Sequence, residues 1–427
     1  MLIVPFVGLI LSFALLPIVA SQFWHRRMIA VAGFWVAVSV VLHQFSPAHS
    51  SYWHDLFEIM LHDYLPFIAL VGSLFVISAG IRLEGTTGGT PLRNTVTLAV
   101  GGVFASVIGT TAAALIFTRT LIDSNNRRAI TSHIFIFAIV IIGNIGGSLT
   151  PLGDPPLLVG FLQGIPFGWF GQNLWPAFLF MMVALLTIFF VIDHFYFIKH
   201  RSQHSQIGFS FASLRIRGFF NLFLLLLLPL ASLLIANFSQ GVSFAALGLE
   251  LPLLPLLTVV VAVVFSTLSL VTTPRLIYLA NRFTVAPLVE VVVLFFGIFA
   301  TISPVIAAVK SLNLTGLTAA IDPASFYFWG SGLFSSVLDN SPTFLIFLNL
   351  YPGSIAELMA NGPKILIALC CGTVFMGALT YIGNAPNLLI RNLVEAEKIA
   401  MPNFFQYLFW VAILLLPLFV VLDWLIL

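Results

Sequence analysis

The sequence is dominated by uninterrupted runs of about twenty apolar residues, and no other feature restricts its fold so strongly. A helix of that length crosses the roughly 30 Å hydrocarbon layer of a bilayer, and only helices or closed barrels satisfy their backbone groups there. Charged residues make up 7% of the 427 residues, whereas a soluble domain carries about 25%. The chain is therefore predicted to be an all-α polytopic membrane protein.

About ten transmembrane helices are expected, at residues 3–20, 27–44, 57–81, 131–162, 174–193, 219–237, 252–272, 287–309, 365–390 and 404–426. Two further apolar stretches, 95–118 and 325–349, are predicted to be re-entrant hairpins. Cytoplasmic loops are enriched in Lys and Arg, and with both stretches re-entrant only Lys310 and Lys364 of the 17 basic residues lie outside. This threading places both termini outside, and a bacterial inner membrane is the expected location.

An internal repeat runs through the chain at an offset of 230 residues. GSLTPLGDPPLL, from Gly147 to Leu158, aligns without gaps on GALTYIGNAPNL, from Gly377 to Leu388. The same offset aligns SVIGTTAAALIF, from Ser106, with SVLDNSPTFLIF, from Ser336. Glycine and proline kinks are common in membrane helices, but unrelated kinks would not share one offset.

The repeat divides the chain into an N-terminal half at 1–195 and a C-terminal half at 219–427, joined by a cytoplasmic linker at 196–218. Each half contains one hairpin and one broken helix, the latter within 131–162 and 365–390. Each also contains five crossings, and because five is odd, the halves are predicted to be inverted. Inverted repeats with broken helices are typical of secondary transporters, which bind substrate near the bilayer midplane.

Polar residues gather at the two hairpin tips and the two breaks, which are expected to meet. The charged members are Asp154 and Asp339. A carboxylate at the centre of a membrane helix costs about 2.5–3.5 kcal/mol, so it usually has a partner, and neither the breaks nor the tips contain a basic residue. Na⁺ is the simplest partner, because hard cations prefer oxygen ligands and a desolvated carboxylate can hold Na⁺ or H⁺. The candidate ligands are Thr110, Thr111, Asn144, Thr150, Asp154, Asp339, Asn340, Ser341, Thr380, Asn384 and Asn387, with Asp154 and Asp339 the predicted Na⁺ carboxylates.

Each candidate also has a purely structural interpretation. Asp154 could only cap the helix that starts at Pro155, and Asp339 could only form an Asx turn. The threonines could only satisfy broken backbone. Among the other titratable groups His62, Asp63 and Glu290 could relay protons, although packing is favoured, and His133 is expected at the interface. The sequence contains no nucleophile elbow, phosphate-binding loop or metal-ligand spacing, so neither an enzyme nor a resident cofactor is expected. It also has no basic stripe for nucleic acid.

The runs GNIGGSLTPLGDPPLLVGF, IGTTAAALIFTRTL and SSVLDNSPTFLIF resemble the ion-transporter superfamily, in particular bacterial members labelled NhaD-type sodium/proton antiporters or citrate transporters. The resemblance implies a homodimer in which a mobile core moves against a scaffold, by an elevator-type mechanism. Carboxylate carriers of this superfamily have Ser-Asn-Thr at both hairpin tips, but here the tips read Gly109-Thr110-Thr111 and Asp339-Asn340-Ser341. Exchange of Na⁺ for H⁺ is therefore favoured over the alternative, Na⁺- or H⁺-coupled citrate or dicarboxylate transport. A channel is a third possibility, less suited to inverted hairpins.

Overall fold

A computed structural model describes residues 1–45, 49–84, 88–199, 215–238, 243–246, 249–281, 283–311 and 322–426. Within these ranges, seven helical stretches are long and apolar enough to cross a membrane. Strands form two short antiparallel ribbons: β1 (Arg82–Glu84) with β2 (Arg215–Arg217), and β3 (Ser243–Ala246) with β4 (Leu249–Pro252). The prediction of a polytopic helical membrane protein is confirmed.

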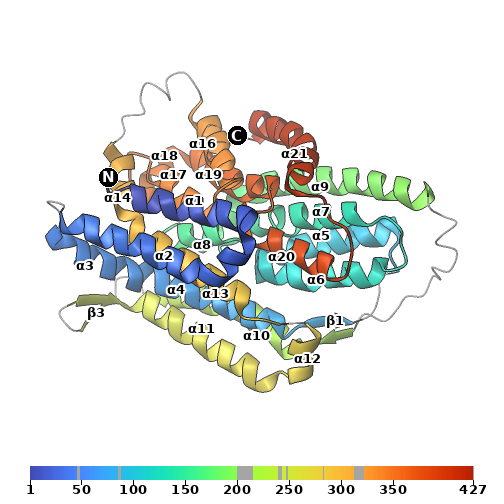
Figure 1. Cartoon of the computed structure of the whole chain (residues 1–427), viewed down its shortest axis with the longest axis horizontal. Coiled ribbons are helices and arrows are strands. Elements are labelled where there is room, and N and C mark those ends of the chain that lie inside the picture. The colour runs from blue at the N-terminus through green and yellow to red at the C-terminus, as the bar shows by residue number, and fades with distance from the viewer. Residues whose placement is uncertain are drawn as a thin grey trace.

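The helices that open the two halves pack together into one bundle, here called the scaffold bundle (Figure 1). Its first-half members are α1 (Val4–Val19), α2 (Ser21–Gln44), α3 (His49–Ile59), the π-helical turn η1 (Met60–Tyr64) and α4 (Leu65–Ala79). Its second-half members are α10 (Phe219–Phe238), α11 (Leu253–Thr272), α12 (Arg275–Ala280), α13 (Ala286–Thr301) and α14 (Ser303–Ser311). Helix α4 lies along α11, while α13 packs against α1 and α2.

The remaining helices form a second group, here called the core bundle. From the first half it takes α5 (Pro91–Ile108), α6 (Thr110–Asn125), α7 (Ser132–Ile141), the 3₁₀ turn η2 (Ile145–Leu149), α8 (Pro155–Leu162) and α9 (Phe167–Lys199). From the second half it takes α16 (Pro323–Ser335), α17 (Asn340–Leu348), α18 (Ile355–Asn361), α19 (Pro363–Met376), η4 (Gly377–Leu379), α20 (Ala385–Ala396) and α21 (Phe404–Ile426). The halves interlock, because α17 packs on α8 and α20 packs on α6 and α7.

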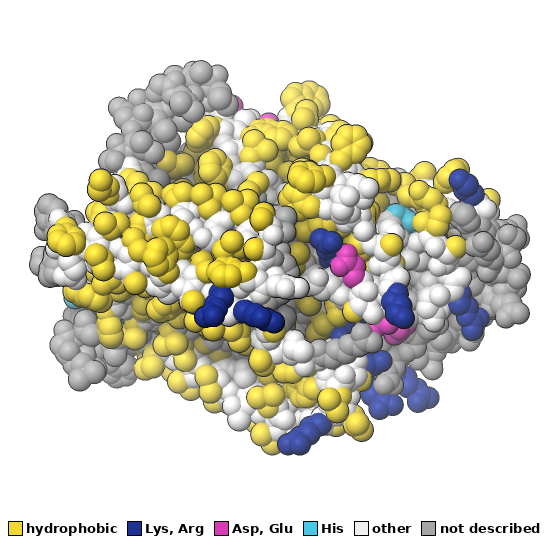
Figure 2. Space-filling model, viewed as in Figure 1, with side chains coloured by type: hydrophobic (Ala, Val, Ile, Leu, Met, Phe, Trp, Pro, Cys, Tyr) yellow, Lys and Arg dark blue, Asp and Glu magenta, His cyan; other side chains and the backbone are white. Residues whose placement is uncertain are grey.

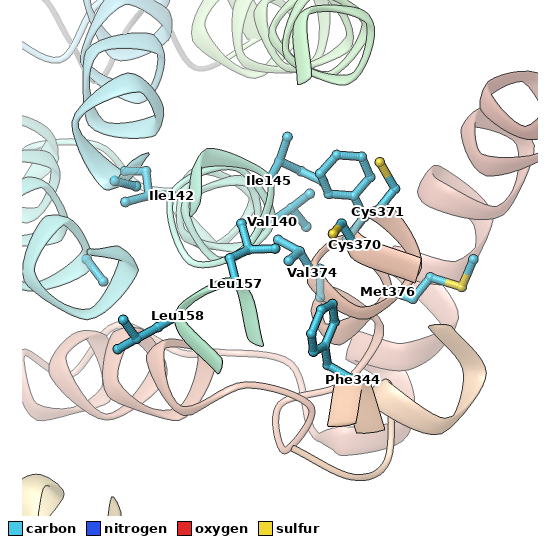
Figure 3. Packing of buried hydrophobic residues seen from close by; sticks show 14 of the residues in the cluster. Val140, Ile142, Ile145, Leu157, Leu158, Phe344, Cys370, Cys371, Val374 and Met376 are labelled. Atoms are coloured by element: carbon cyan, nitrogen blue, oxygen red, sulfur yellow. The ribbon is translucent and has the colours of Figure 1, made fainter. Parts of the chain in front are cut away.

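Apolar side chains occupy both the interior and much of the surface. In α7, every residue from His133 to Ile141 is buried. Figure 3 shows Val140 and Ile145 facing Cys370, Cys371 and Val374 of α19 in a packed centre. Exposed apolar side chains cover a large part of the face in Figure 2, with few charged residues among them. A surface of this kind suits hydrocarbon as the surrounding solvent.

The structure adjusts several predicted boundaries. Both hairpins are present as helix pairs, α5–α6 turning at Gly109 and α16–α17 turning before Asn340. The crossing predicted at 57–81 begins earlier, at His49, and contains the π-helical turn. The crossing predicted at 287–309 is interrupted at Ile302, two residues before Pro304, a residue that cannot donate a backbone hydrogen bond.

The predicted linker at 196–218 is shorter than expected at both ends. Helix α9 continues to Lys199, and Arg215–Arg217 pairs with β1. Most of this predicted linker, residues 200–214, lies outside the described residues.

Candidate functional site

The two broken helices have the same local structure. After η2 the backbone is extended at Thr150, and α8 begins with Asp154 as its N-cap. After η4 it is extended at Thr380, and α20 begins with Asn384 as its N-cap. A proline follows within the first two positions of each helix, where its missing N–H costs nothing. The aligned sequences thus produce aligned breaks.

The threonine of each break fastens it to a hairpin. The hydroxyl of Thr150 donates to the carbonyl of Ser106, and that of Thr380 donates to the carbonyl of Ser336. Each hydroxyl also accepts from the amide two residues further on, at 3.2 Å from Leu152 and 3.3 Å from Ile382. Both threonine hydroxyls therefore bond to backbone groups, as the structural interpretation of these residues expects.

Asp154 is the point at which all four discontinuities meet. Its side chain is buried, and its Oδ1 accepts from the Thr110 hydroxyl at 3.1 Å and from Asn384 Nδ2 at 3.0 Å. Its Oδ2 accepts from Asn340 Nδ2 at 2.8 Å. Thr110 belongs to the first hairpin tip, Asn340 to the second and Asn384 to the second break. The expected convergence is present, with neutral donors supplied by both halves.

Three asparagines, linked by hydrogen bonds, hold the groups that surround Asp154. Asn384 also donates to Asn144 Oδ1 at 3.3 Å, and Asn144 Nδ2 donates to Asn387 Oδ1 at 2.8 Å. Asn387 Nδ2 in turn donates to the carbonyls of Gly377 and Thr380. Because each amide is held by its neighbour, the orientation of the groups around Asp154 is fixed across the two halves.

Asp339 lies at the N-cap of α17 and accepts from the Ser341 backbone amide at 3.3 Å. The turn-forming interpretation is therefore realised, but the half-buried carboxyl group also lines the same cavity as Asp154. The Ser341 hydroxyl is buried and has no hydrogen-bond partner among the described residues. Thr111 is half-buried and lines the cavity.

The cavity, of about 210 Å³, lies between the two bundles. The hairpin tips and breaks form its polar wall, and α1, α4 and α13 form a largely apolar wall. Its charged lining residues are Asp154, Asp339 and Glu290, and no Lys, Arg or His lines it among the described residues. Glu290 accepts from the indole of Trp24 at 3.1 Å. The described lining of the cavity is thus acidic.

Two aspartates outside the cavity, the buried Asp193 and the half-buried Asp423, were not predicted from the sequence. Asp193 binds Arg128 and His133, and Asp423 binds Ser325 and Trp329. The His133 side chain is 5% exposed and bonded to Asp193 inside the protein, and its expected position at the membrane interface stays a prediction. The signal that could have found the two aspartates is their spacing, which equals the repeat offset.

The whole chain, residues 1–427, matches the model of a protein family described as "Putative citrate transport". The chain belongs to this family. Two relatives of this citrate-transport family member, from Mycobacterium bovis and Mycobacterium tuberculosis, are each named an uncharacterized transporter. Each is 28% identical over 185 residues, which cover 40% of this chain and 41% of the relative. The chain thus matches about two-fifths of the length of those curated relatives. Membership agrees with the resemblance to the ion-transporter superfamily and with a multi-pass membrane protein.

Proposed function

We propose that the protein is a secondary active transporter that exchanges Na⁺ for H⁺ by alternating access. The observation that carries the proposal is the setting of Asp154. This carboxylate is buried, receives hydrogen bonds from neutral groups alone among the described residues, and lines a cavity shared with Asp339 and Glu290. An ionisable group at such a position is a functional site by default.

Exchange requires a group that binds either Na⁺ or H⁺ but not both at the same time. The oxygens of Asp154, Thr110 and the neighbouring asparagines are hard ligands suited to Na⁺. When Na⁺ leaves, Asp154 takes up a proton, and the protonated carboxyl group keeps hydrogen-bonding distance to Thr110, Asn340 and Asn384. Competition of Na⁺ and H⁺ for this carboxylate couples their movements in opposite directions.

Na⁺- or H⁺-coupled citrate or dicarboxylate transport is the second candidate, favoured by the description of the family. Citrate would meet three acidic side chains in the cavity and no basic one among the described lining residues. Such a substrate would need bound cations to neutralise the acidic groups, with Asn340 and Asn384 as its hydrogen-bond donors. Because of this requirement, we favour Na⁺/H⁺ exchange over citrate or dicarboxylate transport.

The two functions are separated in inside-out membrane vesicles that hold a proton gradient reported by a pH-sensitive dye. We expect Na⁺ or Li⁺ to collapse the gradient and citrate to have no effect. Citrate-driven currents in liposomes, together with no Na⁺-dependent collapse, would overturn the antiport proposal. The homodimer, the bacterial inner membrane and the external termini stay predictions of the sequence.

A further inference from the structure

Asp193, near the end of α9, gathers three other segments of the first half. Its carboxylate receives Arg128 in a two-pronged ion pair, with Nη1 at 3.0 Å from Oδ2 and Nη2 bonded to Oδ1. His133 Nε2 of α7 lies 2.8 Å from Oδ1, and Asn94 Nδ2 of α5 donates to Oδ2 at 2.9 Å. The Asp193 side chain is fully buried.

These contacts hold the base of the first hairpin. Asn94 lies in the first turn of α5 and Asn125 is the last residue of α6, and the two amides exchange reciprocal hydrogen bonds of 3.0 and 2.9 Å. Arg128 also donates to Asn125 Oδ1 at 3.3 Å. The tip of the hairpin, with Thr110 bonded to Asp154, lies about 20 Å away along α5 at 1.5 Å per residue. A small tilt at the base therefore moves the tip by ångströms.

The second half has an equivalent contact at the repeat offset. Asp423 of α21 accepts from the Ser325 hydroxyl at 2.8 Å and from Trp329 Nε1 at 2.9 Å. Ser325 and Trp329 lie in the first two turns of α16, the first helix of the second hairpin, and Ser325 aligns with the residue after Asn94. Each hairpin is thus fastened at its base to the last helix of its own half.

From this geometry we propose that Asp193 and Asp423 are positioning residues for the ion site. Each fixes the base of one hairpin, so that Thr110 from the first tip and Asn340 from the second meet Asp154. The inference rests on the proposed function for its transport readout but not for its structural one. It assigns a role to two aspartates that lie outside the cavity.

The two anchors differ in strength. The anchor at Asp193 contains a buried two-pronged ion pair, and removing one partner leaves the other charge uncompensated. The anchor at Asp423 uses neutral donors and is half-buried. The first hairpin is therefore the more rigidly held of the two, and loss of Asp193 is expected to displace its tip more than loss of Asp423 displaces the tip of the second.

The test uses the full chain in liposomes, with Cys370→Ala and Cys371→Ala removing the native thiols and Ile108→Cys as a reporter at the first tip. Ile108 is 1% exposed, so N-ethylmaleimide should label the reporter slowly. Asp193→Asn is expected to raise the labelling rate at least tenfold, since the tip loses its register. The matched change Asp423→Asn should leave the labelling rate of this reporter unaltered.

In chains without the reporter, Asp193→Asn should weaken the apparent affinity for Na⁺ about tenfold.

Should Asp193→Asn fail to fold, Asn94→Ala serves in its place, because it releases α5 and leaves the Arg128 ion pair intact. Unchanged labelling and unchanged Na⁺ affinity in a folded variant would overturn the proposal. Equal acceleration by Asp423→Asn would overturn it as well, by indicating general loosening. Labelling needs no substrate, so a wild-type protein that ignores Na⁺ would reject the proposed function and leave the anchors testable.

Discussion

Asp154 occupies the N-cap position of α8, but its side chain makes no capping hydrogen bond and accepts from other segments instead. As the N-cap of α8 it lies at the positive end of a helix, and as the acceptor of three side-chain hydrogen bonds it joins both halves of the chain. Hydrogen bonds to an ionised group contribute about 1.5–3 kcal/mol each. These contacts stabilise a buried carboxylate and leave its oxygens next to the cavity.

Asp154→Asn is expected to abolish Na⁺/H⁺ exchange. The amide keeps the shape but loses the charge, and its NH₂ group faces at least one of the donors that Asp154 now accepts from. Transport is measured with the pH-sensitive dye in liposomes, and folding by thermal unfolding in detergent. Asp322→Asn is the control, because Asp322 caps α16 outside the cavity and asparagine caps comparably well. Full exchange by Asp154→Asn would reduce Asp154 to a helix cap.

At the scale of elements, the first hairpin depends on the backbone of its tip. Gly109 has φ +88°, a conformation that side chains other than glycine rarely adopt, and a Cβ there would come within 3.2 Å of the Leu152 carbonyl. The next residue, Thr110, donates its amide to the Gly153 carbonyl at 2.8 Å. The tip and the first break are therefore held in register by main-chain contacts.

Gly109→Ala should reduce transport strongly, because strain of about 1–3 kcal/mol at the tip shifts Thr110 away from Asp154. Gly164→Ala is the matched control. It has φ +104° and nothing within 4 Å of its added Cβ, so the backbone strain is similar but lies beyond α8. The ratio of initial Na⁺-dependent rates in liposomes measures the difference. Equal losses in both variants would argue that strain alone, wherever it lies, inactivates the protein.

The sequence predicted these elements because their signals are local. Glycine, proline and polar residues inside an apolar run mark a break, and the offset of 230 residues pairs the breaks. The anchor at Asp193 has no local signal of this kind, although the repeat offset pairs Asp193 with Asp423. Its partners Asn94, Arg128 and His133 are scattered through the half, and none stands out within its own segment. The same holds for the Glu290 contact with Trp24, which joins residues 266 apart.

For the molecule as a whole, the cavity lies where the scaffold and core bundles meet. Side chains cross this boundary at separate places. Gln163, at the end of α8, donates to Asp63 of the π-helical turn at 3.3 Å. Arg119 of α6 donates to the carbonyls of Ala280 and Asn281 at the end of α12. If the bundles move against each other during transport, such contacts must break and form again.

A short bis-maleimide joining Asp63→Cys to Gln163→Cys, in a background without Cys370 and Cys371, is expected to stop transport. The link fixes the core to the scaffold. Asn221→Cys with Thr273→Cys is the control pair, because these residues touch within the scaffold bundle, at 2.6 Å between side chains, and move together. Uptake is compared before and after cross-linking. Transport that survives an efficient Asp63–Gln163 link would exclude large relative motion at this boundary.

The interlocking of the halves has a consequence for how the protein is made. The first half is synthesised before Asn340 and Asn384 exist, so Asp154 emerges with Thr110 as its only side-chain donor among those seen in the finished site. Until the second half inserts, Asp154 lacks the hydrogen bonds from Asn340 and Asn384. Helices α8 and α6 also lack the surfaces of α17 and α20 that later cover them. Biogenesis is therefore expected to contain a vulnerable interval in which insertases or quality-control proteases act on the unfinished chain. The length of that interval is set by the time needed to translate the remaining residues.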